Sequence, residues 1–438
     1  MALQEKLLSS FMVFEDNAKV DEKLHDIRIS AIKNFENKGF PTKKEEAWKY
    51  TSLNALLKND FSVFPKAEVS IGIADVKRFF IDETDTYKVV FVNGVFNSFL
   101  SSTTHEGIDV CLFSSALSKP KYREIVDKYF NQIAIKDETL TSLNTAFACE
   151  GAFINIPKGK VADKPIEIVY FSTANQDKLW LQPRNLVIVG ENAQVQIVER
   201  HQSLDNDVVL TNTVTEIFAE KNAILDYYKI QNDVLEANLI DNTYISQQQN
   251  SKVSVHTFSF GGNLTRNNLN FYHFGEHIES TLKGITVIEG KQHVDHYTLV
   301  HHAQPNCESH QDYKGIFGER SIGVFNGKIF VDKIAQKTNA FQQNNNVLVS
   351  EKVTINAKPQ LEIFADDVKC SHGCTIGQLN DSALFYMQQR GIPEKEAKAL
   401  LMYAFCNDVL ASIRIESLQQ RITKIIAQKL GVDLGFNL

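Results

Sequence analysis

The sequence predicts a mainly β protein, in which a parallel β-helix (a solenoid) lies between two helical regions. The first observation is that residues 151–378 show one short strand pattern after another, roughly every 8–12 residues, with almost no helical pattern. The second is length, because sandwiches and closed barrels rarely run this long without helices, whereas a solenoid adds turns indefinitely. The third is that helical periodicity is found on both sides of this stretch.

These patterns divide the chain into three expected regions. Residues 1–150 should be mostly helical with one small β-hairpin, residues 151–378 should form the β-helix core, and residues 379–438 should form a C-terminal helical domain. We expect the hairpin at Tyr87–Phe96, because an Asn-Gly pair stands at its centre between two runs of β-branched and aromatic residues.

Two signals organise the N-terminal region. An apolar stripe with helical spacing ends at Gly39. The stripe consists of Leu24, Ile27, Ile29, Ile32 and Phe35. The segment Pro41–Thr51 then combines a helix-start pattern with two large anchors, Trp48 and Tyr50. We interpret this segment as a packing motif that ties the helical unit to its neighbour.

Two amide-rich stretches interrupt the strand region, Gln247–Asn250 and Gln342–Asn346. Such stretches suit the corners of stacked turns, where side-chain amides can form ladders along the solenoid. They would equally suit solvated loops, so the sequence leaves the choice between the two open.

Helical periodicity returns after the last strand. A short amphipathic helix around Ala383–Met387 should stop at Gly391, and Pro393 should open the next helix. The apolar run over residues 400–410 is wider than one buried stripe requires, which favours a partner surface over simple capping of the solenoid. The residues that we assign to this surface are Leu400, Leu401, Tyr403 and Phe405. A final helix is expected at Ile415–Leu430.

Composition excludes several classes of protein. The net charge of −7 and the pI near 6.0 argue against a general nucleic-acid binder. No run of 18 apolar residues is present, and the N-terminus lacks the order of a signal peptide. Six cysteines in 438 residues are too sparse for a disulfide scaffold, so we expect a reducing, cytoplasmic location.

The densest group of metal-ligand residue types follows Asp366 and Asp367, where Cys370, His372 and Cys374 alternate. In a strand these three side chains lie on one face, with successive ones about 6.5–7 Å apart. A single metal ion needs its ligands within about 2.0–2.3 Å, so a regular strand cannot close a site from these residues alone. Either the chain bends at the intervening glycine, or other residues complete the site.

A second group of histidines occurs between residues 293 and 310, with Cys307 among them. Its members are His293, His296, His301, His302 and His310. A metal site built across a turn at 303–306 is one interpretation. Histidines that line the solenoid turns or its surface are the interpretation that we favour.

Other catalytic signals are missing. Gly261–Asn263 is not followed by the Gly-Lys-Ser/Thr of a phosphate loop, and no dinucleotide or nucleophile-elbow motif is present. Asp366 and Asp367 are adjacent, so on a strand they would face opposite ways and could not act as a carboxylate pair. This weakens the rival hypothesis of a β-helix enzyme acting on polysaccharides.

The segments that carry a family resemblance cover essentially the whole chain. They are Pro41–Thr51, Gly151–Gly159, Tyr313–Ile316, Gln342–Ser350, Ala365–Gly377 and Gly391–Pro393 with the helix after it. In these segments the sequence resembles the SufB/SufD family of scaffold proteins for iron–sulfur cluster assembly. The run from Lys369 to Gly373 favours the SufD branch of that family over the SufB branch.

The resemblance implies a right-handed parallel β-helix whose edge pairs with a SufB-like subunit, and C-terminal helices that dock a SufC-like ATPase of the ABC type. His372 and Cys370 match residues at the SufB–SufD interface, where a nascent Fe–S cluster is thought to assemble, so both are candidate metal and cluster ligands. Cys374 stands where many relatives carry alanine. It is either an extra ligand or a small core residue, and we favour the second interpretation.

On this basis we expect a non-catalytic scaffold subunit, with ATP hydrolysis supplied by the SufC-like partner. No flavin motif is visible, although relatives in the complex have been linked to FAD. An open edge of the β-helix also predicts a homodimer of the isolated chain. The remaining rival is a purely structural interaction protein, in which Cys370 and His372 carry no chemistry.

Overall fold

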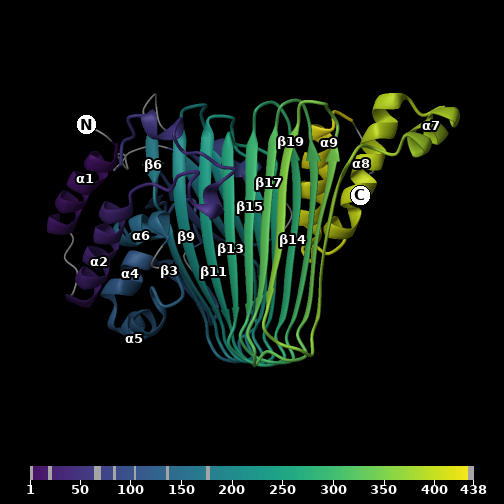
Figure 1. Cartoon of the computed structure of the whole chain (residues 1–438). Coiled ribbons are helices and arrows are strands. Elements are labelled where there is room, and N and C mark those ends of the chain that lie inside the picture. Colours follow the sequence, from purple (N-terminus) through teal and green to yellow (C-terminus); the bar gives the residue numbers. More distant parts are fainter. Residues whose placement is uncertain are drawn as a thin grey trace.

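The centre of the molecule is a β-solenoid, in which the chain passes back and forth between two sheets (Figure 1). This arrangement is seen in a computed structural model that describes residues 3–17, 22–63, 71–81, 85–102, 105–134, 138–173 and 178–432. From β7 onward the strands alternate between the sheets, and each strand before β19 pairs in parallel with the equivalent strand of the turns before and after it. The mainly β fold and the parallel β-helix are therefore confirmed.

The first sheet, sheet A, has the order β19-β17-β15-β13-β11-β9-β7-β4-β3, and β6 pairs with β9. Its strands are β3 (Asp109–Leu112), β4 (Ala152–Ile156), β6 (Leu179–Leu181), β7 (Arg184–Val189), β9 (Val209–Ala219), β11 (Ala237–Gln247), β13 (Leu264–His273), β15 (His293–His302), β17 (Ile322–Val331) and β19 (Thr354–Ile363).

The second sheet, sheet B, has the order β2-β1-β5-β8-β10-β12-β14-β16-β18-β20. Its strands are β1 (Tyr87–Val92), β2 (Val95–Phe96), β5 (Ile166–Ser172), β8 (Gln194–Ser203), β10 (Ile224–Gln231), β12 (Lys252–Ser259), β14 (Glu279–Ile288), β16 (Glu308–Phe317), β18 (Asn339–Leu348) and β20 (Lys369–Gly377). The predicted hairpin is confirmed as β1 and β2. It is not a separate unit, because β1 pairs in parallel with β5 and so belongs to sheet B.

Side chains that point between the two sheets form the core. Since the pairing is parallel and in register, equivalent residues of successive turns stack in columns along the solenoid. In the N-terminal half many positions in these columns are apolar. Buried members include Ile168, Ile197, Tyr227, Val255, Ile217, Ile245 and Phe271. The stacked columns bury a continuous apolar core that no single turn could form.

One corner of the solenoid repeats the same backbone conformation. Asn192, Asn222 and Asn250 occupy equivalent corner positions with φ of 57–58°, a region that asparagine tolerates better than most residues. The Asn222 amide donates to Asn192 Oδ1 at 2.8 Å, and the Asn250 amide donates to Asn222 Oδ1 at 3.0 Å. The corner ladder expected for Gln247–Asn250 is confirmed at Asn250.

The second amide-rich stretch lies elsewhere. Residues Gln342–Asn346 belong to strand β18, and Gln342, Asn344 and Asn346 are buried on its inward side. Placing this stretch at a corner or in a solvated loop was wrong. Its amides instead bond inside the solenoid, where Gln342 donates to Gln311 and Asn346 donates to Asn344.

The N-terminal helices cover the outer face of sheet A (Figure 1). The helices are α1 (Leu3–Asn17), α2 (Glu22–Lys38), α4 (Phe113–Ser118), α5 (Pro120–Tyr129) and α6 (Thr139–Ala146), with short 3-10 turns at Glu46–Trp48 and Leu56–Lys58. Helix α3 (Ile73–Val76) and the 3-10 turn Lys77–Phe79 pack instead on the outer face of sheet B, beside β1 and β5. The predicted stripe is confirmed in α2, which ends at Lys38 before Gly39 adopts φ of 70°. Helices α1 and α6 bury their apolar residues beside Leu210 and Ile240 of sheet A.

The segment Pro41–Thr51 is a packing motif, as predicted. Trp48 is 3% exposed, and the guanidinium of Arg266 on β13 lies 4.0 Å from the centre of its ring. Arg266 also donates to the carbonyl of Ala47 at 2.8 Å and pairs with Asp295 on β15. These contacts fasten the N-terminal segment to the middle of sheet A.

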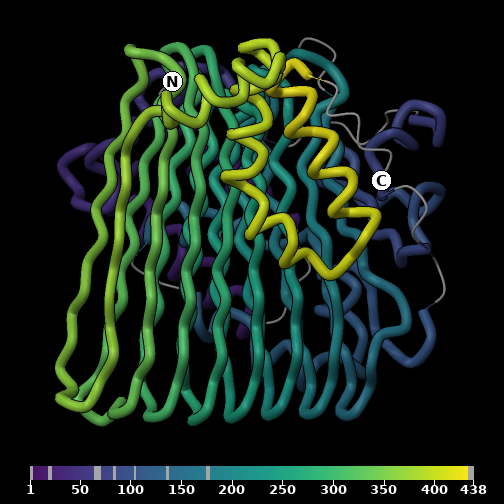
Figure 2. The backbone as a smooth tube through the Cα atoms, turned by 90° about the vertical axis from the view of Figure 1, so that its right-hand side faces the viewer, coloured from purple at the N-terminus to yellow at the C-terminus, as the bar shows by residue number. Residues whose placement is uncertain are grey.

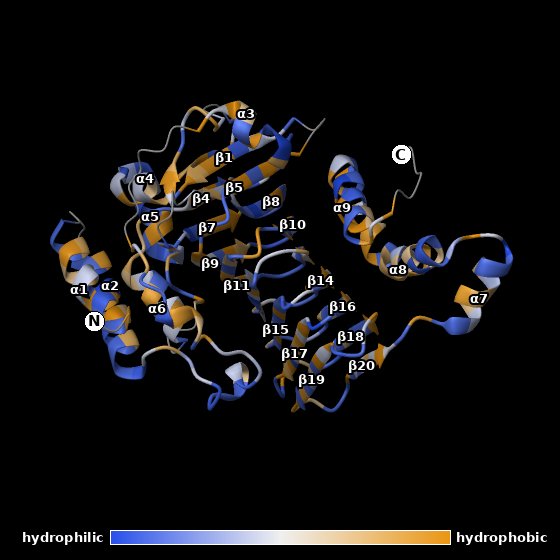
Figure 3. Ribbon diagram, turned by 90° about the horizontal axis from the view of Figure 1, so that it is seen from above, coloured by the Kyte–Doolittle hydropathy of each residue, from blue (hydrophilic) through white to orange (hydrophobic). Residues whose placement is uncertain are grey.

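The C-terminal helices cover the other face of the solenoid. Helices α8 (Glu394–Leu410) and α9 (Glu416–Lys429) lie across the outer face of sheet B (Figure 2). Helix α7 (Asp381–Gln389) has no buried residue and stands away from the strands (Figure 3). The expected helix boundaries are confirmed, with Gly391 at φ of 84° after α7 and Pro393 directly before α8. No helix within the described part of the chain is long and apolar enough to cross a membrane.

Candidate functional site

The residues with metal-ligand chemistry lie in the last turn of the solenoid. β20 ends sheet B and β19 ends sheet A, and among the described residues no strand pairs with the outer edge of either. Asp366 and Asp367 lie in the corner between these two strands and not on a strand, which corrects the placement assumed above. At the opposite end, the turn over residues 97–102 bonds to β1 and so covers the edge of the sheet there.

Strand β20 continues the regular register of the turn before it. Cys370 pairs with Ala340, His372 with Gln342, and Cys374 with Asn344. The chain therefore does not bend at the glycine between His372 and Cys374, and the first of our two alternatives for closing a site was wrong.

All three side chains lie on the inward side of β20. Their partners in register on β18, namely Ala340, Gln342 and Asn344, are at most 5% exposed inside the solenoid. Because parallel strands in register place paired residues on the same face, Cys370, His372 and Cys374 continue these interior columns. They are the last members of their columns and so face the open end.

The two thiols have different surroundings. Cys370 is half-buried and packs with Leu361 and Ile363 of β19. Cys374 is exposed, so the expectation of a small core residue was wrong, and its Sγ lies 3.8 Å from Oδ1 of Asn344. Burial raises the pKa of both thiols, which favours their protonated forms. His372 is exposed.

These groups do not form a complete ligand set. Within the described ranges no cluster of three or more histidine, cysteine, aspartate or glutamate side chains is arranged to hold a metal ion. Thiolates and imidazoles are nevertheless the ligand types that suit iron–sulfur species. A site at Cys370 and His372 therefore needs further ligands from outside the described chain.

The backbone at this end is also unpaired. The N–H of Lys369 donates to the carbonyl of Thr338 at 2.8 Å, so Lys369 directs its backbone groups toward β18. In a parallel ladder the direction alternates along the strand. The N–H and C=O groups of Cys370, His372 and Cys374 therefore point toward the free edge, on the same three residues that carry the ligand side chains.

The second histidine group does not form a site. His302 points inward, and its Nδ1 lies 3.1 Å from Nδ1 of His273, whereas His310 is exposed on β16 and stacks on Phe341. Cys307 is fully buried at a corner position equivalent to Ala223 and Ser251. The metal site across the turn was therefore wrong, and the turn-lining interpretation agrees with the structure.

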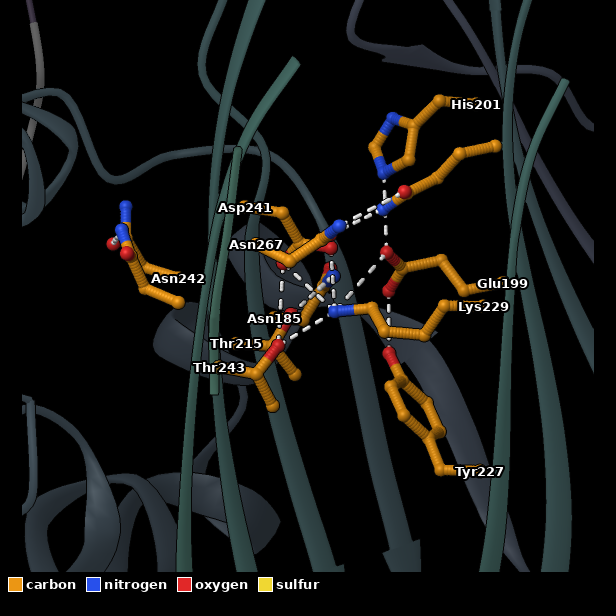
Figure 4. Close-up of polar contacts among 12 residues, drawn as sticks. Asn185, Glu199, His201, Thr215, Tyr227, Lys229, Asp241, Asn242, Thr243 and Asn267 are labelled. Carbon is orange, nitrogen blue, oxygen red and sulfur yellow. Dashed lines mark hydrogen bonds and ion pairs between the residues drawn. The ribbon is translucent and has the colours of Figure 1, made fainter. Parts of the chain in front are cut away.

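The sequence analysis missed a buried polar network in the middle of the solenoid (Figure 4). Lys229 donates from Nζ to Asp241 Oδ1 at 2.7 Å and to Thr243 Oγ1 at 2.6 Å, and its Nζ lies 3.9 Å from Glu199 Oε1. Tyr227 donates to Glu199, and Nε2 of His201 lies 3.1 Å from Glu199 Oε1. The available signal was a charged residue at an inward position of three strands, Glu199 on β8, Lys229 on β10 and Asp241 on β11.

The residues assigned to a partner surface lie on α8. Leu400, Leu401, Tyr403 and Phe405 are all half-buried. Tyr403 and Phe405 pack against the apolar cluster that α8 and α9 share with sheet B, and Nζ of Lys314 lies 5.3 Å from the Phe405 ring. These two side chains therefore contribute to the attachment of α8 whether or not they also contact a partner.

The most exposed aromatic residues of the C-terminal region lie on α7. Phe385 is 62% exposed and Tyr386 is 60% exposed. Large apolar side chains that remain in water at the surface of a projecting helix are typical of an interaction site. The sequence analysis did not single out these two residues, because a short helix gives a weak periodic signal.

Comparisons with known proteins place these observations in a family. Residues 171–405 match the family described as "SUF system FeS cluster assembly, SufBD core domain", and residues 7–168 match the "SufBD protein N-terminal region". An iron–sulfur cluster assembly SufBD family protein of Synechocystis is 32% identical, over 88% of this chain and 87% of the relative. The iron–sulfur cluster assembly protein SufD of Escherichia coli is 29% identical over 90% of both chains, and SufD of Bacillus subtilis is 26% identical over 93% and 94%.

Proposed function

This chain belongs to the SufBD family of SUF-system iron–sulfur cluster assembly proteins, and we propose that it acts as a SufD-type scaffold subunit. In this role it pairs with a SufB-like subunit and binds a SufC-like ATPase. It holds iron and sulfide as cargo at the shared edge and carries out no catalysis of its own. ATP hydrolysis by the partner drives the rearrangement that exposes the cargo.

The observation that carries the proposal is the coincidence of two incomplete features at the end of β20. The backbone edge is unpaired, and Cys370 and His372 form only part of a ligand set. Neighbouring strands in a sheet lie about 4.8 Å apart, closer than the 6.5–7 Å between same-face residues along one strand. An added strand from a second subunit brings ligands within reach of one metal ion and pairs the edge at the same time.

The test is anaerobic reconstitution with iron and sulfide, comparing this chain alone with the complex that contains its SufB-like and SufC-like partners. We expect cluster absorption and Mössbauer signals in the complex only. His372→Ala should reduce those signals severalfold without changing the circular dichroism spectrum, because the side chain is exposed and supports no core packing.

The matched control is His310→Ala. His310 is an exposed histidine on the outer face of sheet B, away from the edge. This variant should assemble clusters like the unmodified complex. Equal cluster yield from His372→Ala and His310→Ala would refute the role of His372 and leave an architectural subunit.

We further propose that the C-terminal helices dock the ATPase. The surface consists of the assigned residues on α8, namely Leu400, Leu401, Tyr403 and Phe405, together with Phe385 and Tyr386 on α7. The exposure of Phe385 and Tyr386 on a helix that stands away from the solenoid supports this choice. Charged substitutions at Leu400 and Phe405 should weaken ATPase binding or disturb the attachment of α8.

Phe385→Asp separates weaker ATPase binding from a disturbed attachment of α8. Helix α7 has no buried residue, so removing an apolar side chain from it does not affect the solenoid. We expect an unchanged circular dichroism spectrum and at least a tenfold weaker pull-down of the ATPase subunit, the scale of one lost interface anchor. Ser382→Asp on the same exposed helix is the control. Normal ATPase binding by folded Phe385→Asp and Leu400→Asp variants would exclude this surface.

Two further expectations belong to this proposal. An open β20 edge favours pairing of the isolated chain with itself, which analytical ultracentrifugation would detect as a homodimer. All six cysteines are free thiols, which is consistent with a reducing cytoplasmic location.

A further inference from the structure

A column of polar side chains inside the solenoid leads to His372. Gln311 on β16, Gln342 on β18 and His372 on β20 occupy equivalent positions in the register of sheet B. Both glutamines are 2% exposed, whereas His372 is exposed in the last turn. Since paired residues of parallel strands lie on the same face, about 4.8 Å apart, the His372 ring lies next to the Gln342 amide.

Gly327 leaves the space that the amide of Gln342 occupies. This glycine lies on β17 across the interior, and a Cβ at its position would overlap with Nε2 of Gln342. One turn earlier the interior is filled differently, because the hydroxyl of Thr298 donates to Gln311 Oε1 at 2.8 Å. The surroundings therefore hold the Gln342 amide with its nitrogen against these neighbours.

The hydrogen bond of Gln342 sets the direction of its amide. Nε2 donates to Gln311 Oε1 at 3.3 Å, in the turn before. In a ladder of stacked amides, each group donates to one neighbour and accepts from the other, so Oε1 of Gln342 is directed to the following turn. This oxygen is buried and has no hydrogen-bond partner within the described ranges. The following turn carries His372 at this position.

Neighbouring side chains of β20 already donate in this direction. Oγ1 of Thr375 donates to Asn345 Oδ1 on β18 at 2.7 Å, and the Cys374 thiol lies 3.8 Å from Asn344 Oδ1. In both cases a side chain of the last turn meets an amide oxygen of the turn before. The His372 ring has no hydrogen-bond partner among the residues that the structure describes, so a donor and an acceptor without partners stand side by side.

From these contacts we infer that Gln342 is the positioning residue for His372. One ring N–H of the neutral imidazole donates to Gln342 Oε1, which fixes the orientation of the ring and keeps the proton on that nitrogen. The other ring nitrogen then has its lone pair available for iron. The ligand role of His372 belongs to the proposed function, and the inference adds the group that prepares the ring for it.

NMR of the isolated chain, labelled with ¹⁵N at histidine, tests this hydrogen bond without any metal. At about pH 8 an exposed imidazole is neutral, and its nitrogen signals distinguish the two tautomers. We expect one tautomer of His372 to exceed the other by about fivefold or more, the ratio that one net hydrogen bond supports. In Gln342→Leu the ratio should approach that of free histidine under the same conditions. His372→Gln assigns the signal.

Two further variants separate positioning from packing. Gln342→Glu keeps an acceptor oxygen in either protonation state, so it should retain the tautomer preference of the unmodified chain. Gln343→Leu changes the next residue, an exposed side chain on the outer face of the same strand, and should leave the His372 signal unchanged. Thermal unfolding of each variant checks that the fold is kept.

Reconstitution with iron and sulfide, in the complex with the SufB-like and SufC-like partners, measures the consequence for the cargo. Gln342→Leu should need about tenfold more iron for half-maximal cluster absorption, the scale of loss when the hydrogen-bond partner of a ligand is removed. Gln342→Glu and Gln343→Leu should match the unmodified complex.

The outcomes distinguish this inference from the proposed function. The same His372 tautomer ratio in Gln342→Leu and in the unmodified chain would overturn the hydrogen bond. A ratio that changes while Gln342→Leu needs no more iron would overturn the positioning role. Normal cluster formation by His372→Ala would refute the ligand role of the proposed function, and the positioning role with it, whatever the tautomer ratio.

Discussion

At the scale of single residues, Lys229 has the clearest energetic role in the core. Its Nζ lies between the carboxylates of Asp241 and Glu199, and all three side chains are at most 5% exposed. Lys229→Met should lower the free energy of unfolding by about 3–5 kcal/mol, because removal of one partner leaves uncompensated buried charge. Chemical denaturation followed by circular dichroism measures the change.

Two further variants test whether the stability lost in Lys229→Met comes from unpaired buried charge. Adding Asp241→Asn to Lys229→Met should recover part of the loss, because it removes one of the two stranded charges. Lys252→Met breaks an exposed pair with Glu279 and should have little effect. A Lys229→Met protein as stable as Lys252→Met would contradict a compensating role for the ammonium group.

Buried histidines give the protein a defined response to acid. Burial lowers the pKa of His256 and His302 to about 3 and that of His296 to about 4. The unfolded chain binds protons at these residues near pH 6.5, so the stability that they contribute is present above that pH and is lost on acidification. Each should cost about 2 kcal/mol of stability between pH 6.5 and pH 5.

Buried acids oppose this trend, because burial raises the pKa of Glu138, Glu167, Asp241 and Asp233. Burial raises the pKa of Asp233 to about 6, so its contribution is lost as the pH rises from 3.8 through 6. Burial also lowers the pKa of His273 and His293, and we expect the buried histidines together to outweigh the buried acids, so the midpoint of thermal unfolding should fall from pH 7 to pH 5. His302→Gln should reduce that fall, while His277→Asn, at an exposed corner where other turns carry asparagine, should not. Equal falls in both variants would contradict the assignment to buried histidines.

The site residues illustrate what a sequence reveals at this scale. The alternation of Cys370, His372 and Cys374 already predicted a shared face and an incomplete ligand set, because both follow from strand geometry. The positions of Cys307 and His302 were not predictable in the same way. Their surroundings depend on which turn stacks on which, and no local pattern encodes that register.

At the scale of elements, the repeated corner determines how the turns stack. Asn222 has φ of 58° and connects Asn192 and Asn250 through side-chain hydrogen bonds. Asn222→Val should lower the free energy of unfolding by about 2 kcal/mol, because a β-branched residue is strained in this region and the ladder is broken. Asn222→Gly keeps the conformation and should lose less than half as much.

Thermal unfolding of the two variants provides the comparison. The order of the two losses in unfolding free energy is more informative than their size, because Asn222→Gly removes the side-chain ladder without straining the backbone. Equal losses in the valine and glycine variants would mean that the side-chain ladder, which both remove, dominates at this corner and that the backbone conformation does not.

The positions of the strands were easier to predict from the sequence than the residues that each strand contacts. Alternating apolar residues mark strands locally, and the strands between β4 and β20 agree with the expected pattern except at β18. The stretch Gln342–Asn346 was misplaced because amide side chains usually indicate contact with water. In this fold stacked turns supply amide partners such as Gln311, so burial of these side chains leaves few hydrogen bonds unmade.

At the scale of the whole molecule, a solenoid is close to one-dimensional, because each turn contacts mainly the turns beside it. The N-terminal segment departs from this rule. It fastens to sheet A at β13 and β15 through Arg266 and Asp295, and Glu46 pairs with Lys358 of β19. Residues early in the sequence thereby link the middle of the solenoid to its open end, which local sequence patterns could not indicate.

Arg266→Met tests this long-range attachment. The guanidinium pairs with Asp295, donates to Ala47 and stacks on Trp48, and it is 2% exposed. Its removal leaves Asp295 buried without its cation, so the free energy of unfolding should fall by about 3–5 kcal/mol. The segment around Trp48 should also detach more often, and trypsin should cleave at Lys43, Lys44 and Lys49 faster than in the unmodified protein.

The controls distinguish local release from general destabilisation. Arg320→Met removes an exposed arginine at a corner and should leave both stability and cleavage unchanged. Adding Asp295→Asn to Arg266→Met should recover stability but not slow the cleavage, because Trp48 and Ala47 still lack their partner. Unchanged cleavage in Arg266→Met would mean that the N-terminal segment is held by its apolar contacts alone, and that its link to the open end does not depend on this arginine.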